Sequence, residues 1–296
     1  MSQKKHLAFP NKSDSVRLAI GVLGIGTSGP LIALSTMPVL TLIFWRNLGG
    51  TLLLLPFALR NREWKTKEHR KAITWSMLAG VWLGLHFLAF FAAMRYKTVA
   101  TGTALTCLQP IFAALYVSFR GNKIPRKSWS GMAIAFCSVL LITGIDLAIG
   151  GKYFLGDLAG IAAGALAAAY MLTGAHAQKV VATSTYAVVC YFFCAITALV
   201  SALILKVKLF GFPTREWILC GLLILGAQIL GHTMFNLTLK RVSPVVVSLI
   251  IFFEVPVSAI LAAIWLHQRI QLGIIPGLFG LIIGCALFVV RSDKND

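Results

Sequence analysis

Ten apolar stretches, each near the length of a bilayer crossing, fill almost the whole of this chain of 296 residues. A bilayer core of about 30 Å needs roughly 20 apolar residues per helical crossing, because lipid offers no partner to an open backbone group. We expect helices at 17–35, 38–58, 72–94, 98–119, 128–146, 156–178, 184–205, 215–238, 243–266 and 272–290. The sequence therefore predicts an all-α membrane protein with ten transmembrane helices.

The polar connections between these stretches are short. The longest, from Arg60 to Lys71, has too few residues to bury a core of its own. Hydrophobic residues make up 58% of the chain and charged residues only 12%, whereas a soluble core of this length would be interrupted more often by polar faces. No separate soluble domain is expected.

The formal net charge of +18 invites comparison with nucleic-acid-binding proteins, but the placement of the charges argues against that function. If the N-terminus is cytoplasmic, nineteen of the 27 Lys and Arg residues fall in cytoplasmic segments, seven fall on the opposite side, and Arg46 lies within a helix. Cytoplasmic connections of membrane proteins carry such an excess of Lys and Arg. We therefore expect both termini in the cytoplasm, basic loops that face the lipid bilayer, and no nucleic-acid partner.

The sequence gives no sign of a metal, cofactor or nucleotide site. All six cysteines fall in apolar helix, and none has metal-ligand spacing to a histidine. There is no Gly-rich phosphate loop or Walker lysine that would support ATP-driven transport. We expect no cofactor, no bound metal and no disulfide framework.

The two halves of the chain show a weak internal repeat. When the sequence is shifted over itself by 146 positions, several residues of rare type coincide. The coinciding pairs are Gly80 with Gly226, His86 with His232, Arg95 with Arg241, Pro110 with Pro256 and Gly131 with Gly277. The His and Pro matches weigh most, because the chain has only six His and ten Pro. We expect two repeats, residues 1–148 and 149–296, that together form one membrane domain.

Five helices per repeat place the two repeats upside down relative to each other, because an odd number of crossings leaves the chain on the opposite side. Inverted repeats are a transporter architecture in which the substrate site lies near the midplane between the halves. Alternating access uses this symmetry directly, whereas an enzyme or a receptor has no need of it.

Several short motifs add a family resemblance over residues 17–290. They are Phe44-Trp45-Arg46 in the second helix, Pro110 in the fourth, Leu239-Lys240-Arg241-Val242-Ser243 before the ninth, Glu254 and Pro256 within it, and Gly277 in the tenth. With them the chain resembles the drug/metabolite transporter superfamily, EamA type. It departs from the family pattern where Glu-Pro is usual, because Val255 intervenes, and where Gly-Glu often closes helices four and nine. The resemblance implies proton-linked or facilitated export of small metabolites, amino acids among them.

Two charged residues stand out inside predicted helices, where inserting a charge costs about 3 kcal/mol or more. Arg46 has two interpretations. It is either an anion anchor for a substrate carboxylate, or a structural arginine whose donors are satisfied by carbonyls and water within the helix packing. Glu254 is a proton carrier, or a structural carboxylate beside the backbone break at Pro256. Gln109, and Ser28 in a Gly- and Pro-interrupted part of the first helix, are further candidates for the pathway.

Gln228, His232 and Asn236 recur every fourth residue and predict a polar stripe on the eighth helix. Their repeat partners on the third helix are Trp82, His86 and Phe90. We expect the two helices to face each other across the pathway, with hydrogen-bonding groups on one wall and aromatic rings on the other. Such a site suits an amphipathic metabolite. The alternative is that each histidine only makes a hydrogen bond between helices.

These observations predict a secondary transporter that exports amino acids or related amphipathic compounds across the bacterial inner membrane, as a monomer or homodimer, and not an enzyme. The alternatives are a membrane-embedded transferase and a non-transporting membrane partner protein. Transferase chemistry usually needs a membrane-edge cluster such as His with a nearby Asp. Asp146 and Asp157 lie near the predicted outer edge, but no His lies beside them in the sequence.

The charge distribution predicts that Lys5, Lys67 and Lys294 face the cytoplasm. Single cysteines at these positions, in a cysteine-free background, should resist an impermeant thiol reagent added to intact cells. A cysteine in place of Lys208, which the same topology puts outside, should react readily and is the matched control. Ready labelling at any of the three cytoplasmic positions would overturn the topology.

Overall fold

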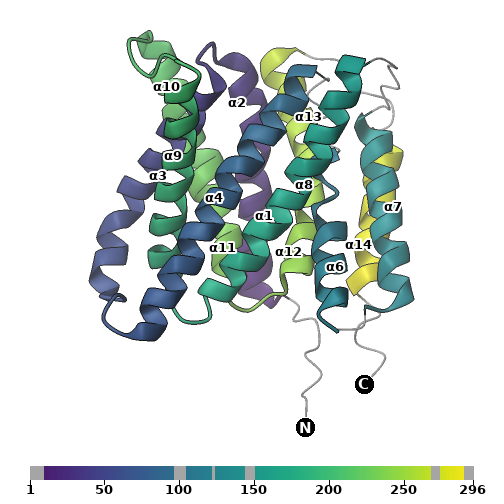
Figure 1. The fold of residues 1–296 in the computed structure, drawn as a ribbon. Helices are drawn as coiled ribbons and strands as arrows, with labels where there is room; N and C mark the ends of the chain where they lie inside the picture. The colour runs from purple at the N-terminus through teal and green to yellow at the C-terminus, as the bar shows by residue number, and fades with distance from the viewer. Residues whose placement is uncertain (1–9, 97–104, 122–123, 144–150, 268–273, 290–296) are drawn as a thin grey trace.

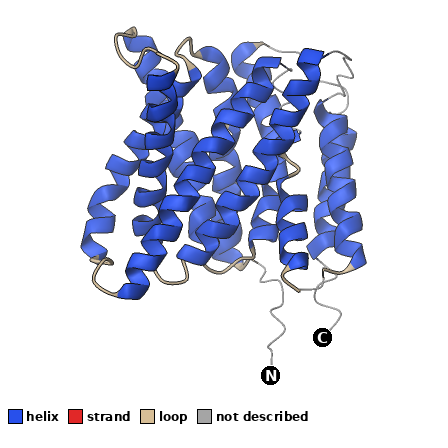
Figure 2. Ribbon diagram, in the orientation of Figure 1, coloured by secondary structure: helices blue, strands red, loops and turns tan. Residues whose placement is uncertain are grey.

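The computed structural model describes residues 10–96, 105–121, 124–143, 151–267 and 274–289, and these form helices and short connections without a strand (Figure 2). The helices of the first half are α1 (Lys12–Gly26), α2 (Ser28–Leu34), α3 (Val39–Asn61), α4 (Lys67–Tyr96), α6 (Gln109–Phe119) and α7 (Arg126–Thr143). The second half begins with α8 (Gly151–Ala177), α9 (Thr183–Ile204), α10 (Thr214–Leu223), the π-helix η1 (Ile224–Thr233) and α11 (Met234–Thr238). It ends with α12 (Pro244–Ile250), the 3-10 helix η2 (Ile251–Phe253), α13 (Glu254–Leu266) and α14 (Ile274–Val289).

Seven helical segments of the described residues are long and apolar enough to cross a membrane. They are Lys12–Leu34, Val39–Asn61, Lys67–Ala93, Phe154–Ala177, Thr183–Ile204, Thr214–Thr238 and Pro244–Leu266. Each coincides with one of the predicted spans. The other three predicted spans contain α6, α7 and α14, which do not belong to this group of seven. Parts of these three spans lie outside the described residues, so ten crossings stay a prediction.

The first span is divided where the sequence predicts an interruption. α1 ends at Gly26 and α2 begins at Ser28, with Thr27 between them. Pro30 has no N–H to donate to the carbonyl one turn earlier, which favours a break in the helical ladder. The Thr27 hydroxyl donates to the carbonyl oxygen of Gly24 at 2.7 Å and so satisfies one of the carbonyls at the end of α1.

The fourth and ninth spans are interrupted at equivalent places. α6 begins at Gln109, directly after a turn at residues 107–108. In the ninth span, η2 separates α12 from α13 at residues 251–253. Each break lies just before the repeated proline, Pro110 or Pro256, whose missing N–H leaves the carbonyl one turn earlier without its helical donor.

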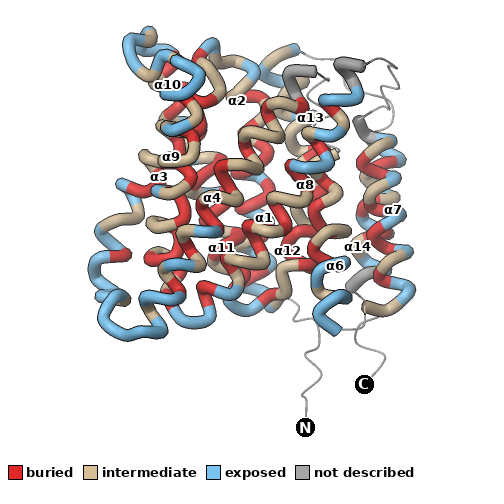
Figure 3. The backbone as a smooth tube through the Cα atoms, in the orientation of Figure 1, coloured by how far each residue is buried: buried red, intermediate tan, exposed pale blue. Residues whose placement is uncertain are grey.

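The helices pack as a bundle with a paired edge on each side (Figure 1). α3 packs against α9 at one edge, and α7 packs against α14 at the other. Between these edges α4 packs against α8 and α9, while α1 packs against η1 and α11. Buried residues run through the middle of the bundle and exposed ones gather on its outside and at the helix ends (Figure 3). Large exposed apolar side chains such as Phe57 and Phe279 suit a surface that faces lipid.

Glycines let several of these helices approach closely. A Cβ added at Gly24 of α1 would lie 2.6 Å from the backbone nitrogen of Gly231 in η1. A Cβ at Gly80 of α4 would lie 2.3 Å from the carbonyl oxygen of Cys190 in α9. Because the opposing atoms belong to the backbone, neither neighbour can move aside by changing a rotamer.

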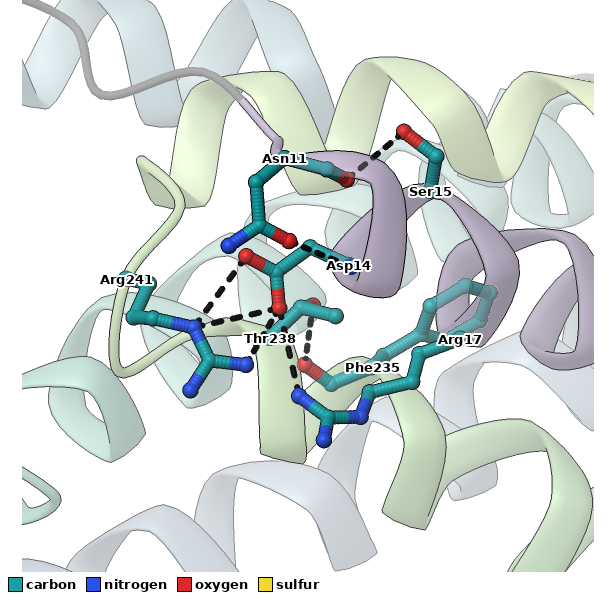
Figure 4. Close-up of polar contacts among 7 residues, drawn as sticks. All are labelled: Asn11, Asp14, Ser15, Arg17, Phe235, Thr238 and Arg241. Atoms are coloured by element: carbon teal, nitrogen blue, oxygen red, sulfur yellow. Dashed lines mark hydrogen bonds and ion pairs between the residues drawn. The ribbon is translucent and has the colours of Figure 1, made fainter.

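An ion pair joins the start of α1 to the connection between α11 and α12 (Figure 4). The Asp14 carboxylate accepts hydrogen bonds from Nε of Arg241, at 3.1 Å to Oδ2, and from Arg17 at 3.3 Å. The bonds with Asp14 raise the pKa of the Arg241 guanidinium. Asn11 caps α1 by accepting from the Asp14 N–H at 2.9 Å. The Asp14 side chain is 1% exposed, so this buried carboxylate needs both arginines as partners.

The contact of Gly24 with the η1 backbone predicts that Gly24→Ala destabilises the bundle by about 1–3 kcal/mol, the usual cost of overpacking. A thermal melt of the detergent-solubilised protein should show a lower midpoint. Gly221→Ala in α10 is the matched control, because a Cβ there would meet nothing within 4 Å. Equal melting midpoints for the two variants would contradict the close packing of α1 on η1.

Candidate functional site

A cavity lies among helices of both halves. The first half contributes Ile25, Ser28, Leu83, His86, Phe87, Phe90, Thr106, Cys107, Gln109 and Pro110. The second half contributes Ala167, Tyr170, Met171, His232, Phe235, Ser248, Ile251, Phe252 and Glu254. Mostly apolar walls with a few polar groups are typical of a site for a small molecule.

Aromatic rings form much of one wall. His86 stacks on Phe90, with ring centroids 6.0 Å apart and planes at 13°. Phe87 meets the ring of His232 edge-on at 5.6 Å, and Tyr170 meets the same histidine at 6.2 Å. Such a wall offers flat apolar surface on which a ring or an aliphatic chain can pack.

The two cavity histidines differ in how they are held. Nδ1 of His86 lies 3.0 Å from the carbonyl oxygen of Ala163, so this nitrogen carries the hydrogen and donates it. In the neutral ring Nε2 is then an acceptor. Nε2 of His232 has no hydrogen-bond partner among the described residues. His232 thus lines the cavity with one ring nitrogen unpaired, whereas His86 is fixed to α8.

Polar side chains from the two broken spans complete the wall. Glu254 is the first residue of α13, and Gln109 is the first residue of α6. A carboxylate in the first turn of a helix is stabilised by the positive end of the helix dipole. Gln109 donates from Nε2 to the sulfur of Met171 at 3.2 Å. The breaks in these spans thus bring a carboxylate and an amide to the cavity.

Arg46 lies behind the aromatic wall. Its side chain, on α3, is 1% exposed, and Nε donates to Oε1 of Gln228 at 2.9 Å. Its guanidinium carbon lies 4.6 Å from the ring centroid of Phe87. Nη1 and Nη2 have no hydrogen-bond partner among the described residues. Phe87 both contacts the guanidinium and lines the cavity, whereas Arg46 is absent from the lining.

A buried hydrogen-bond network ties Arg46 to the wall. Gln228 accepts from Arg46 and donates from Nε2 to Oδ1 of Asn47 at 3.0 Å. Further along, the hydroxyl of Tyr170 donates to Oδ1 of Asn236 at 2.8 Å, and Nδ2 of Asn236 lies 3.3 Å from the hydroxyl of Tyr191. Each amide is held from both ends, which fixes its orientation.

Of the predicted polar stripe on the eighth helix, only His232 lines the cavity. Gln228 bonds to Asn47 of α3, and Asn236 bonds to Tyr170 of α8. The hydrogen bonds of η1 span five residues instead of four. Binding of a substrate by this stripe stays a prediction.

Six of the ten side chains predicted from the sequence line the cavity. These are Ser28, His86, Phe90, Gln109, His232 and Glu254. The other four, Arg46, Trp82, Gln228 and Asn236, are absent from its lining, and Trp82 packs against the hydrophobic core. Whether any of the ten binds a substrate stays a prediction.

Sequence reasoning missed several parts of the site. Phe87 and Tyr170 are ordinary apolar positions by pattern, and their role depends on contacts with distant helices. Of the two candidates for a transferase site, Asp146 lies outside the described residues. In the part of the chain that the structure describes, no group of three or more His, Cys, Asp or Glu is placed to hold a metal ion.

The cavity wall predicts which engineered thiols react. Cysteines in place of His86 and His232 should be modified by a small maleimide, because both positions border open space. Trp82→Cys, one turn from His86 on α4, should react at about a tenth of that rate or less, since thiols in apolar surroundings ionise poorly. Equal reactivity at 82 and 86 would show that the cavity is not where the structure places it.

Comparison with known proteins agrees with this architecture. A solved crystal structure of a protein superposes with a TM-score of 0.78 at 15% sequence identity, covering 96% of this chain and 99% of its own, which shows a shared fold. No match was found among curated proteins. The model of the EamA-like transporter family matches residues 17–144 and 154–290. The chain is thus a multi-pass membrane protein that belongs to the EamA-like transporter family.

Proposed function

We propose that the protein is a secondary transporter that exports amino acids or related amphipathic metabolites across the bacterial cytoplasmic membrane by alternating access. The observation that carries this proposal is a cavity whose wall comes from both halves of the chain. The wall has aromatic rings, the carboxyl group of Glu254, and His232, whose Nε2 has no partner among the described residues. The direction and the membrane come from the family resemblance alone.

Alternating access needs two related halves, and the helix contacts support inverted repeats. The repeat relates α4 to η1 and α11, and it relates α8 to α1. A contact of α4 with α8 therefore predicts a contact of η1 and α11 with α1, and both contacts are present. The pairs α3 with α9 and α7 with α14 map onto themselves. α1 begins and α14 ends on the same face of the bundle, as ten crossings with both termini in the cytoplasm require (Figure 1).

The charges around the cavity suit a zwitterion. Glu254 on the wall would hold an ammonium group, and the Arg46 guanidinium beyond Phe87 would hold a carboxylate. The rings between them would pack against a side chain. Arg46 and Glu254 form no direct ion pair, because both terminal nitrogens of Arg46 lack a hydrogen-bond partner among the described residues. A ligand with both charges satisfies both sites at once.

Transport by the purified protein tests this proposal. Liposomes that contain the protein and a mixture of unlabelled amino acids should accumulate tritiated amino acids by counterflow, whereas protein-free liposomes should not. Substrate should also slow maleimide labelling of cysteines at 86 and 232 and leave native Cys220, which lies off the cavity wall, unchanged. Failure of every amino acid to exchange above the protein-free level would reject the proposed substrate class.

Two variants assign the charged residues within the same assay. Arg46→Ala should weaken apparent affinity for amino acids about tenfold or more, the loss expected for a charge-assisted hydrogen bond, and leave amines without a carboxylate unaffected. If Glu254 carries protons, Glu254→Gln should abolish uptake driven by a pH gradient but keep counterflow. Intact gradient-driven uptake would leave Glu254 a structural residue.

A further inference from the structure

The Arg46 guanidinium is buried with an incomplete set of hydrogen bonds. Nε is bonded to Gln228, but the two terminal nitrogens have no partner among the described residues. A buried charge with open donors is unfavourable unless another group supplies acceptors. The terminal nitrogens present a planar fork of N–H groups that matches the two oxygens of a carboxylate. The open donors therefore mark a place for an anion.

The ring of Phe87 closes this place off from the cavity. One face of the ring lies under the guanidinium, with 4.6 Å between the guanidinium carbon and the ring centroid. The ring also makes a T-shaped contact with His232, which lines the cavity and whose Nε2 has no partner among the described residues. The ring itself lines the cavity and is only 4% exposed. A ligand in the cavity thus meets Phe87 before it can meet Arg46.

We propose that Phe87 is an aromatic gate over an anion subsite, and that a carboxylate of the ligand replaces the ring against the Arg46 guanidinium. The inference rests on the proposed function for the identity of the ligand as a transported carboxylate. The inference goes beyond the proposed function because it names the residue that controls access to Arg46.

The contacts on each side show which part moves. Arg46 is held through Gln228, which Asn47 holds in turn at 3.0 Å, so the guanidinium stays in place. Phe87 has no polar atom in its side chain; it contacts the guanidinium, the rings of His86 and His232, and other apolar residues of the core. Charge-assisted bonds from a bidentate carboxylate are stronger than a ring contact with the same cation. The exchange therefore favours opening when a carboxylate is present.

The gate also gives selectivity. A neutral or cationic ligand gains no bond to the guanidinium, so it has nothing to offset the lost contact between Phe87 and Arg46. Only an anionic group recovers the lost interaction and satisfies the open donors as well. Small carboxylates should reach Arg46 more easily when the ring is removed. The state in which the ring covers Arg46 then no longer exists and no longer reduces the apparent affinity.

The chemical reactivity of Arg46 tests the gate without any transport measurement. The purified protein is treated with phenylglyoxal, and the modification of each arginine is followed by mass spectrometry of chymotryptic peptides. In the natural protein Arg46 should react more slowly than exposed Arg60 of the same helix. Phe87→Ala should raise the Arg46 rate about tenfold or more and leave the Arg60 rate unchanged, since it removes the closed population. Sodium acetate should then slow the modification of Arg46 in this variant.

Further variants keep the test decisive. Phe87→Leu retains apolar volume without a ring and serves if Phe87→Ala does not fold; it should raise the Arg46 rate in the same direction. Phe91→Ala, one turn along α4 and buried away from the cavity, should leave the rate as it is. Equal rates for Arg46 and Arg60 in the natural protein, or an unchanged Arg46 rate in both Phe87 variants, would overturn the gate. Absence of acetate protection in an opened variant would overturn the anion subsite.

These readouts separate the gate from the proposed function. A protein that exchanges no amino acid in liposomes but shows fast, acetate-protected Arg46 modification in Phe87→Ala keeps the gate and loses the substrate class. A protein that transports amino acids with no change in Arg46 reactivity keeps its function and loses the gate.

Discussion

Inside a bilayer, backbone that leaves the α-helical pattern must be buried in protein or border a cavity, because lipid cannot satisfy its open groups. The interruptions described in this bundle all meet this constraint, and they meet it at the same cavity. The break after Gly26, the turn at residues 107–108, the π-helix η1 and the 3-10 helix η2 each contribute residues to the wall of the same cavity. The residues that follow these interruptions also supply polar groups to the wall, namely Ser28, Gln109 and Glu254. The cavity is therefore where the helices of both halves stop being regular.

Hydropathy and prolines predict much of this arrangement. The apolar spans follow from length and composition, and the breaks before Pro110 and Pro256 follow from the missing N–H of proline. The π-helix could not be predicted, because hydropathy and spacing do not report whether a ladder bonds over four residues or five. The Asp14–Arg241 pair was missed as well: it joins positions 227 apart, and each residue by itself reads as an ordinary charge near a helix end.

Arg46 shows why a polar pattern on one helix is not yet a site. Gln228 was expected to face a ligand, and it holds the arginine in place instead. A polar residue in an apolar helix must find some partner, and another helix is as good a partner as a substrate. Sequence spacing marks these side chains as polar and inward, whereas the choice of partner depends on how α3 and η1 approach each other. The close approach of Gly50 to Gln228, with a Cβ there only 2.8 Å from Cγ of Gln228, is part of that packing.

His86 and His232 occupy equivalent repeat positions but are held differently. His86 is bonded to the backbone of α8 through Nδ1, whereas Nε2 of His232 has no partner among the described residues. In a transporter with inverted repeats, the two access states exchange the conformations of the two halves. On the proposed mechanism, the opposite state would exchange the surroundings of His86 and His232.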